Sequence, residues 1–134
     1  MKLDLSSFAK ALASLDEALT EYDRTQSQFV KDACIQRFEY TYELAHKLLK
    51  RQLEAMSPNP SEFDQMSFPD RIRTGAERGL LLNSWDEWRR FRDARNATSH
   101  AYNEKKANEV FVRIPAFRDE AAFLLARLAE RNAE

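Results

Sequence analysis

The chain contains 134 residues, of which 43% are hydrophobic and 32% are charged, and its formal net charge is −1. This length is sufficient for one domain with its own hydrophobic core, without disulfide or metal crosslinks. The single cysteine, Cys34, excludes an internal disulfide and is typical of a reducing cytosol. Only two glycines and four prolines are present, which predicts a few long helices and few loops.

The N-terminal segment shows no targeting signal. Charged residues alternate with leucines over residues 1–20, so the continuous apolar stretch of a signal peptide is missing. No segment reaches the apolar length that a membrane-spanning helix needs. We therefore expect a single domain over residues 1–134 that is cytoplasmic and has no membrane partner.

Two long amphipathic helices are predicted in the first half of the chain. In residues 5–22 the apolar side chains recur at intervals of three and four, which forms one helical stripe of Leu5, Phe8, Leu12, Leu15, Leu19 and Tyr22. Residues 28–56 repeat this pattern with Ile35, Phe38, Tyr42, Ala45, Leu49, Leu53 and Met56. Pro58 and Pro60 stop the second helix, and a polar loop is expected from there to Phe68.

The next two helices are predicted from their end signals. Pro69 is well placed in the first turn of a short helix that ends near Gly79. Ser84 and Glu87 match a capping box that opens a fourth helix. One face of this helix carries Trp85, Trp88, Arg92, Arg95, Ser99 and Tyr102.

Asn103 resembles another N-terminal cap and starts the last predicted helix. Its apolar stripe consists of Val110, Ile114, Phe117, Ala121, Leu124 and Leu128. Pro115 lies inside this run and is expected to kink the helix by removing one backbone hydrogen bond. Together the elements predict an all-α fold, an antiparallel up-down four-helix bundle with one short extra helix. Because apolar positions extend beyond a single stripe, we also expect a homodimer.

Charge is unevenly distributed along the chain. Residues 1–70 contain 8 Lys/Arg against 12 Asp/Glu, residues 71–106 contain 9 against 5, and residues 107–134 contain 4 against 5. The near-neutral total normally argues against nucleic-acid binding, but the basic excess falls in the segment that holds Arg95 and His100. A solvated helix face with scattered charge explains the same distribution, so charge alone does not decide between the two.

The two histidines do not complete a metal site. Glu43 and His46 match the Glu-x-x-His unit of di-iron bundles, but a complete site needs a second such unit. His100, the other histidine, has Ala97 where the second glutamate would stand. Glu43 and Lys47, one turn apart, are more simply a helix-stabilising ion pair. We therefore expect no metal and no other cofactor.

The segment from Arg95 to Tyr102 contains residue types suited to phosphate chemistry. An arginine binds phosphate oxygens with a planar fork of donors, and a histidine transfers protons near neutral pH. RNA cleavage by its own 2′-hydroxyl needs a proton acceptor and a cation for the phosphorane-like charge, and it needs no metal. Asn96 lies one turn before His100, so its amide can hold the imidazole in one tautomer.

On an ideal helix Arg95 and His100 point about 140° apart. Either the backbone departs from helical geometry near His100, or two subunits pair so that these residues of both converge in one cleft. A purely structural interpretation is also open, in which Arg95 caps carbonyls, His100 sits favourably at a helix C-terminus and Tyr102 packs in the core.

The run from Arg95 to Tyr102, with its Arg-Asn pair, its histidine and its tyrosine, resembles the signature of the HEPN superfamily of small α-helical proteins. Residues 37–50 are similar to the second helix of one branch, the nucleotidyltransferase substrate-binding proteins, and Trp85 and Trp88 also match it. Tryptophan is common in that branch at the position of His46, which we interpret as an interface substitution. The resemblance covers nearly the whole chain.

The resemblance implies a partner and a chemistry. Such proteins are typically encoded beside a minimal nucleotidyltransferase (MNT) and form a complex with it, many as the toxin of a toxin–antitoxin pair. These toxins are metal-independent endoribonucleases whose cleft forms between two subunits, which implies RNA as the substrate and a hetero-oligomer with the MNT antitoxin. By the same resemblance, Arg95 binds the scissile phosphate, His100 transfers protons, Asn96 orients and Tyr102 lines the cleft. Related toxins are silenced by adenylylation of a tyrosine at this motif, which implies the same modification for Tyr102.

Two alternatives accompany this interpretation. Some members of the branch are described only as substrate-binding subunits of a two-component nucleotidyltransferase, without activity of their own. A degenerate helical scaffold without a site is the other alternative, and the intact motif argues against it. The ribonuclease toxin and the substrate-binding subunit differ in whether Arg95 and His100 must be intact for an effect on RNA.

Overall fold

The computed structural model describes residues 2–133, and every regular element within that range is helical. The four longest helices are α1 (Ser6–Thr25), α2 (Gln28–Ala55), α5 (Trp85–Ala97) and α7 (Ile114–Arg131). Three shorter helices are α3 (Glu62–Gln65), α4 (Phe68–Glu77) and α6 (Glu104–Phe111), and a single 3₁₀ turn, η1 (Thr98–His100), follows α5. The all-α bundle predicted from the sequence is confirmed. No helix of the described range has both the length and the apolarity needed to cross a membrane.

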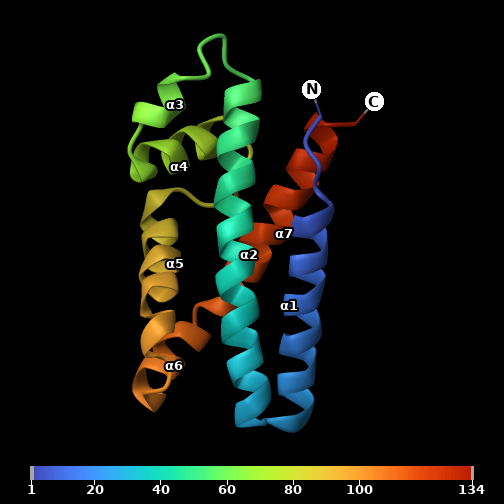
Figure 1. Cartoon of the computed structure of the whole chain (residues 1–134), viewed down its shortest axis with the longest axis vertical. Helices are drawn as coiled ribbons and strands as arrows, with labels where there is room; N and C mark the ends of the chain where they lie inside the picture. Colours follow the sequence, from blue (N-terminus) through green and yellow to red (C-terminus); the bar gives the residue numbers. More distant parts are fainter. Residues whose placement is uncertain (1, 134) are drawn as a thin grey trace.

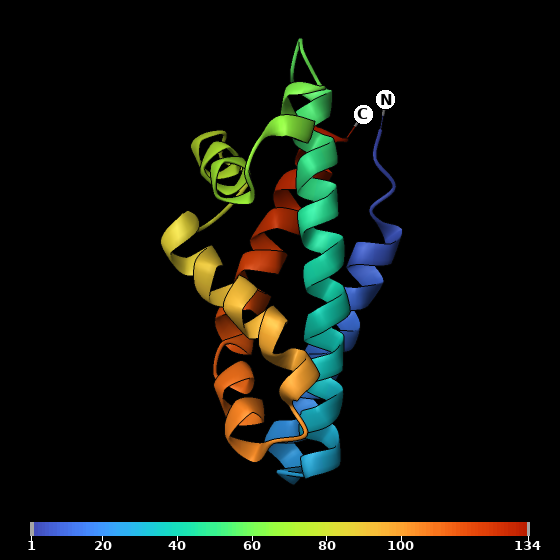
Figure 2. The ribbon, with the colours of Figure 1, turned by 60° about the vertical axis from the view of Figure 1, so that its left-hand side comes forward.

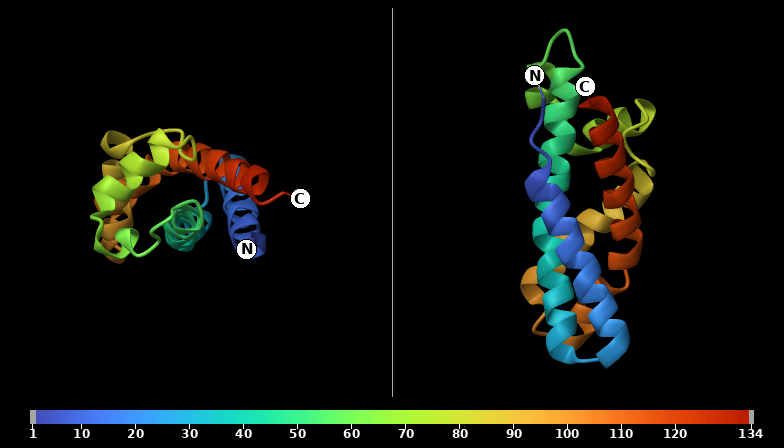
Figure 3. Two further views of the ribbon diagram at one scale, coloured as in Figure 1. Left: turned by 90° about the horizontal axis from the view of Figure 1, so that it is seen from above. Right: turned by 90° about the vertical axis from the view of Figure 1, so that its right-hand side faces the viewer.

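Helix α2 is the central element of the bundle (Figure 1). Helix α1 packs antiparallel along one side of α2, and α7 crosses behind both (Figures 1 and 3). Helix α5 runs down from α4 to α6 on the other side of α2, as Figure 2 shows. The two ends of the chain meet, because the Leu3 backbone N–H donates to Asn132 Oδ1 (3.0 Å) and the Asn132 amide donates to Gln52 Oε1 (2.9 Å).

Several helices begin where the sequence places a capping residue. Ser27 accepts hydrogen bonds from backbone N–H groups at the start of α2, and Ser67 and Asn103 do the same for α4 and α6. Ser84 stands at the start of α5, as predicted, but its side chain makes no capping hydrogen bond. The predicted capping box is therefore wrong, and Glu87 instead lies 3.5 Å from the Arg90 guanidinium one turn later.

Two other expectations are corrected by the structure. The loop expected up to Phe68 contains the short helix α3, whose Phe63 is completely buried. Pro115 does not kink a long last helix, because that segment is divided into α6 and α7 and Pro115 lies in the first turn of α7. Proline is favoured at that position, since the N–H groups of a first helical turn have no partner within the helix.

An aromatic cluster fills the centre of the core. Phe117 of α7 makes edge-on contacts with Phe38 of α2 (ring centroids 5.1 Å apart) and with Phe91 of α5 (5.5 Å). Trp88 packs edge-on against Phe91 at 5.4 Å and lies 5.9 Å from Tyr42. Because these rings come from α2, α5 and α7, they fix α5 against the rest of the bundle.

A buried carboxylate secures the entry to α5. Glu120 of α7 is 0% exposed and accepts hydrogen bonds from the Leu82 N–H (2.7 Å), the Asn83 N–H (2.9 Å) and Trp88 Nε1 (2.9 Å). Burial raises the pKa of Glu120 above its ordinary value, and the N–H donors oppose that rise only in part. This residue thus joins α7 to the loop that precedes α5.

Candidate functional site at the C-terminal end of α5

The backbone changes its helical geometry within the motif. Helix α5 ends at Ala97, and Thr98–His100 form the 3₁₀ turn η1. The turn continues with hydrogen bonds from Ala101 N–H to the Thr98 carbonyl (3.2 Å) and from Asn103 N–H to the His100 carbonyl (3.0 Å). The helix predicted to extend to Tyr102 is therefore shorter, because the backbone departs from α-helical geometry before His100.

Arg95 points towards α2, where two glutamates one turn apart face it. Its Nε donates to Glu43 Oε1 at 2.8 Å, and its Nη1 lies 3.8 Å from Glu39 Oε2. Thr98 Oγ1 lies within hydrogen-bond distance of both the same Glu39 carboxylate and the Arg95 carbonyl (2.8 Å), and its single O–H donates to one of them. Arg95 Nη2 makes no hydrogen bond or ion pair within the described residues, and the Arg95 side chain is 32% exposed.

Glu43 links Arg95 to His46. The His46 Nε2 lies 3.1 Å from Glu43 Oε2, while the other carboxylate oxygen accepts from Arg95. Partial burial alone would raise the pKa of Glu43, but hydrogen bonds and charge from His46 and Arg95 bring that pKa below its ordinary value. The expected ion pair between Glu43 and Lys47 is wrong, because Arg95 and His46 occupy this carboxylate.

His100 and Asn96 lie on the exposed side of this helix end. Neither side chain makes a hydrogen bond within the described part of the chain, and Asn96 does not hold His100 in this conformation. The His100 side chain is consequently exposed at this end of the helix.

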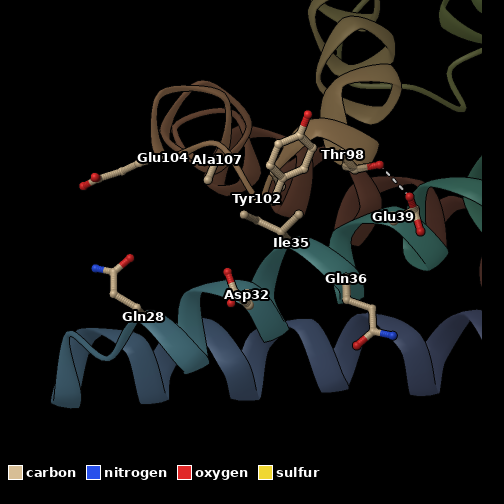
Figure 4. A pocket seen from close by; sticks show the side chains of 10 residues that line it. Gln28, Asp32, Ile35, Gln36, Glu39, Thr98, Tyr102, Glu104 and Ala107 are labelled. Atoms are coloured by element: carbon tan, nitrogen blue, oxygen red, sulfur yellow. Dashed lines mark hydrogen bonds between the residues drawn. The ribbon is translucent and has the colours of Figure 1, made fainter.

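Tyr102 is 89% exposed. The purely structural interpretation of the motif required this side chain to pack in the core, and that part of it is wrong. The Tyr102 ring stands over Ile35 with the hydroxyl pointing away from α2 (Figure 4). It borders a groove of about 630 Å³ between α2 and the segment from η1 to α6. The groove is lined by Gln28, Asp32, Ile35, Gln36, Glu39, Thr98, Ala101, Tyr102, Glu104 and Ala107. Three of these residues are acidic, and Arg95, Asn96 and His100 do not line the groove.

The site of one chain therefore has two parts. Arg95 lies against α2 and supplies a held cation, while His100 and Tyr102 lie in the open and supply an imidazole and a hydroxyl. Within residues 2–133 no group of three or more His, Cys, Asp or Glu side chains has the geometry of a metal site. The arrangement suits acid–base and phosphate chemistry performed by side chains.

Comparison with known proteins defines the class. The family model described as nucleotidyltransferase substrate binding protein like matches residues 3–130. The chain belongs to this family, and the resemblance deduced from residues 37–50 and the motif of α5 is confirmed.

Two comparisons each find a similar chain from Haemophilus influenzae. A protein named probable ribonuclease HepT is 36% identical over 140 residues, which is 98% of this chain and 95% of the relative. A solved structure, described as revealing the fold of a substrate-binding domain of a nucleotidyltransferase, superposes with a TM-score of 0.86 at 31% identity. That match covers 93% of this chain and 98% of the other.

Sequence reasoning missed the role of one residue at the site and of one residue that secures the other end of α5. Glu43 was assigned to Lys47, because its true partner, Arg95, is separated from it by 52 positions. Glu120 carried a detectable signal, since it lies three residues after Phe117 and four before Leu124, on the apolar side of α7. A charged residue at such a position usually has a buried partner.

Proposed function

We propose that this protein is a metal-independent endoribonuclease of the HEPN type, the toxin of a toxin–antitoxin pair. The observation that carries the proposal is the exposed His100, which has no hydrogen-bond partner within residues 2–133, in the same segment as an arginine that α2 holds in place. The name of the ribonuclease relative, which matches over almost its full length, supports the same activity.

The proposed reaction is transesterification within RNA. The 2′-oxygen attacks the adjacent phosphorus and loses its proton, the bond from phosphorus to the 5′-oxygen breaks, and the 5′-oxygen gains a proton. The products are a 2′,3′-cyclic phosphate and a free 5′-hydroxyl. His100 transfers these protons, Arg95 Nη2 binds a non-bridging phosphate oxygen, and Asn96 orients the imidazole when substrate is bound.

A homodimer completes this site. Arg95 faces α2 while His100 faces outward, so pairing two copies brings a held guanidinium of one and an open imidazole of the other to one cleft. A strict monomer in light scattering, from a preparation that still cleaves RNA, would remove the two-subunit cleft from the proposal.

Substitution of His100 tests the catalytic role. General acid–base assistance contributes about 10²–10⁴-fold, so His100→Ala is expected to lose roughly that factor in RNA cleavage. Arg95→Lys is also expected to fail, because a point charge does not reproduce the planar fork. Cleavage of a labelled RNA in the presence of EDTA measures both variants, with circular dichroism as the check on folding. Equal activity of His100→Ala and the parent contradicts the proposal.

The antitoxin in this proposal is a minimal nucleotidyltransferase that modifies Tyr102. The exposed Tyr102 oxygen attacks the α-phosphorus of a nucleoside triphosphate, pyrophosphate leaves, and the phenol loses its proton. The attached nucleotide adds a negative phosphodiester near the site, which repels RNA and competes for Arg95. Mass spectrometry of the chain co-expressed with its partner is expected to find the nucleotide on Tyr102. An unmodified Tyr102 in a fully neutralised sample discards this mechanism and leaves steric occlusion.

The alternative function is a non-catalytic subunit that presents a substrate to a nucleotidyltransferase. The contacts of Arg95 with Glu43 and Glu39 favour it, because an arginine held by two carboxylates is partly neutralised before substrate arrives. The description of the solved Haemophilus influenzae structure supports it as well. RNA that stays intact with the purified chain, combined with stimulation of the partner's transferase activity, decides for this alternative.

A further inference from the structure

We propose that Arg92 is a second phosphate-binding residue of this protein, which holds the RNA strand two turns before His100. The inference rests on the proposed ribonuclease function and adds to it the course of the strand along α5. The first observation is that the guanidinium N–H groups of Arg92 have no acceptor within the described residues. The Nε of Arg92 is buried and has no hydrogen-bond partner, and its terminal nitrogens make no hydrogen bond or ion pair within the described residues.

Arg92 is nevertheless held in place. Its guanidinium carbon lies 4.8 Å from the centre of the Trp85 ring, which is the geometry of a cation–π contact. Phe68 of α4 packs edge-on against Trp85, with ring centroids 5.8 Å apart. A cation that is fixed by an aromatic ring and lacks a carboxylate is prepared for an anion, because the cost of ordering the side chain has already been met.

The face of α5 that carries Arg92 continues towards the motif that contains His100. At about 100° per residue, Trp85, Arg89 and Asn96 lie within about 60° of Arg92 around the helix. Arg89 also has no carboxylate partner within residues 2–133, in contrast to Arg90, which pairs with Glu87 at 3.5 Å. Along the helix axis, Arg92 and His100 are roughly 12 Å apart. An RNA strand bound at His100 can span this distance and place a neighbouring phosphate at Arg92.

The acidic residues near α5 leave this face of the helix open. Asp86 and Asp93 lie about 100° or more around the helix from Arg92. Glu39 and Glu43 of α2 face Arg95 instead. Arg92 and Arg95 are thus neighbours on one helix with different environments, and Arg92 carries the uncompensated charge that attracts a phosphodiester.

The experiment measures RNA binding without cleavage. The parent for binding is the His100→Ala protein, and the probe is a short fluorescein-labelled single-stranded RNA followed by fluorescence anisotropy over a salt series. Arg92→Gln is expected to bind about tenfold more weakly. The slope of log affinity against log salt should fall by about 0.7, the value for one phosphate contact on a single strand. Arg90→Gln, on the same helix but paired with Glu87, is the matched control and should change the affinity less than twofold.

Arg92→Lys separates a lost charge from a structural effect. A lysine keeps the phosphate contact as a point charge, so the salt slope is expected to return to the parent value. If Arg92→Gln binds RNA as Arg90→Gln does, the inference is wrong while the proposed function stands. If the folded His100→Ala protein binds no RNA at low salt, both fail together. A changed subunit number of Arg92→Gln in light scattering, with an unchanged salt slope, overturns the inference and assigns this face of α5 to contacts between copies.

Discussion

Two glutamates hold the two ends of α5, and they do so in opposite environments. Glu120 lies in the core at the N-terminal end and accepts N–H groups of the preceding loop and of Trp88. Glu43 lies at the C-terminal end, partly exposed, and meets the cationic side chain of Arg95 together with His46. Burial raises the pKa of Glu120, whereas for Glu43 the effect of burial is outweighed by hydrogen bonds and charge, which lower the pKa.

The contrast separates folding from function within one helix. Neutral N–H donors around a buried carboxylate fix a backbone, and the arrangement has no free donor left for a ligand. A half-exposed carboxylate beside an arginine orients the guanidinium but leaves its outer nitrogen accessible. We infer that Glu120 determines where α5 begins, while Glu43 determines where Arg95 points.

The largest expected effect is on stability at Glu120. Glu120→Ala leaves the buried Trp88 Nε1–H and two partly buried backbone N–H groups without their acceptor, so the free energy of unfolding should fall by roughly 3 kcal/mol or more. Urea unfolding followed by circular dichroism measures the change. Glu130→Ala on the same helix removes an exposed carboxylate that pairs with Arg127 at 3.0 Å and should change stability by under about 0.5 kcal/mol. Equal losses of unfolding free energy in the two variants would contradict the structural role assigned to Glu120.

A smaller and different effect is expected at Glu43. Glu43→Ala should leave the free energy of unfolding within about 1 kcal/mol of the parent, because the pair is partly exposed. RNA cleavage should nevertheless slow by on the order of tenfold to a hundredfold, since Arg95 loses its orientation. Glu43→Gln keeps one acceptor for Arg95 Nε and should recover part of the rate. Glu54→Ala on the same helix, paired with Lys50 at 3.8 Å, is the control. Unaltered cleavage by Glu43→Ala would contradict the assigned role.

The smallest expected effect is a pH dependence of opposite sign at the two residues. A carboxyl with a raised folded-state pKa stabilises most below its unfolded value near 4.5 and loses that contribution as pH rises through the raised pKa. The destabilisation caused by Glu120→Gln should therefore shrink as pH rises from about 4.5, by at most about 1.4 kcal/mol per pH unit. Glu43 has a lowered pKa, so its contribution is present above pH 4.5 and is lost as pH falls through the lowered value. Unfolding of both glutamine variants across acid pH measures the two trends, and slopes of equal sign would contradict this contrast.

The sequence by itself determined most of the helices and the family to which the chain belongs. Apolar spacing of three and four residues predicted α1 and α2 almost to their ends, because a helix that buries one face imposes that period. Pro69 and Asn103 predicted the starts of α4 and α6, because a proline in the first turn and an N-terminal cap both act on residues a few positions apart. The motif from Arg95 to Tyr102, with residues 37–50, was sufficient to recognise the family.

Only the tertiary structure decided how these residues are used. The contact between Glu43 and Arg95 joins α2 to α5, and the Glu120 hydrogen bonds join α7 to the loop before α5. Such pairs depend on how helices cross, and local spacing carries no record of a partner across the bundle. For the same reason Glu43 was assigned to Lys47, its neighbour along the helix. The sequence likewise did not indicate that Arg92 packs on Trp85 and has no hydrogen-bond partner within the described residues. Periodicity is a property of one helix, whereas the environment of a charge is a property of all the helices around it.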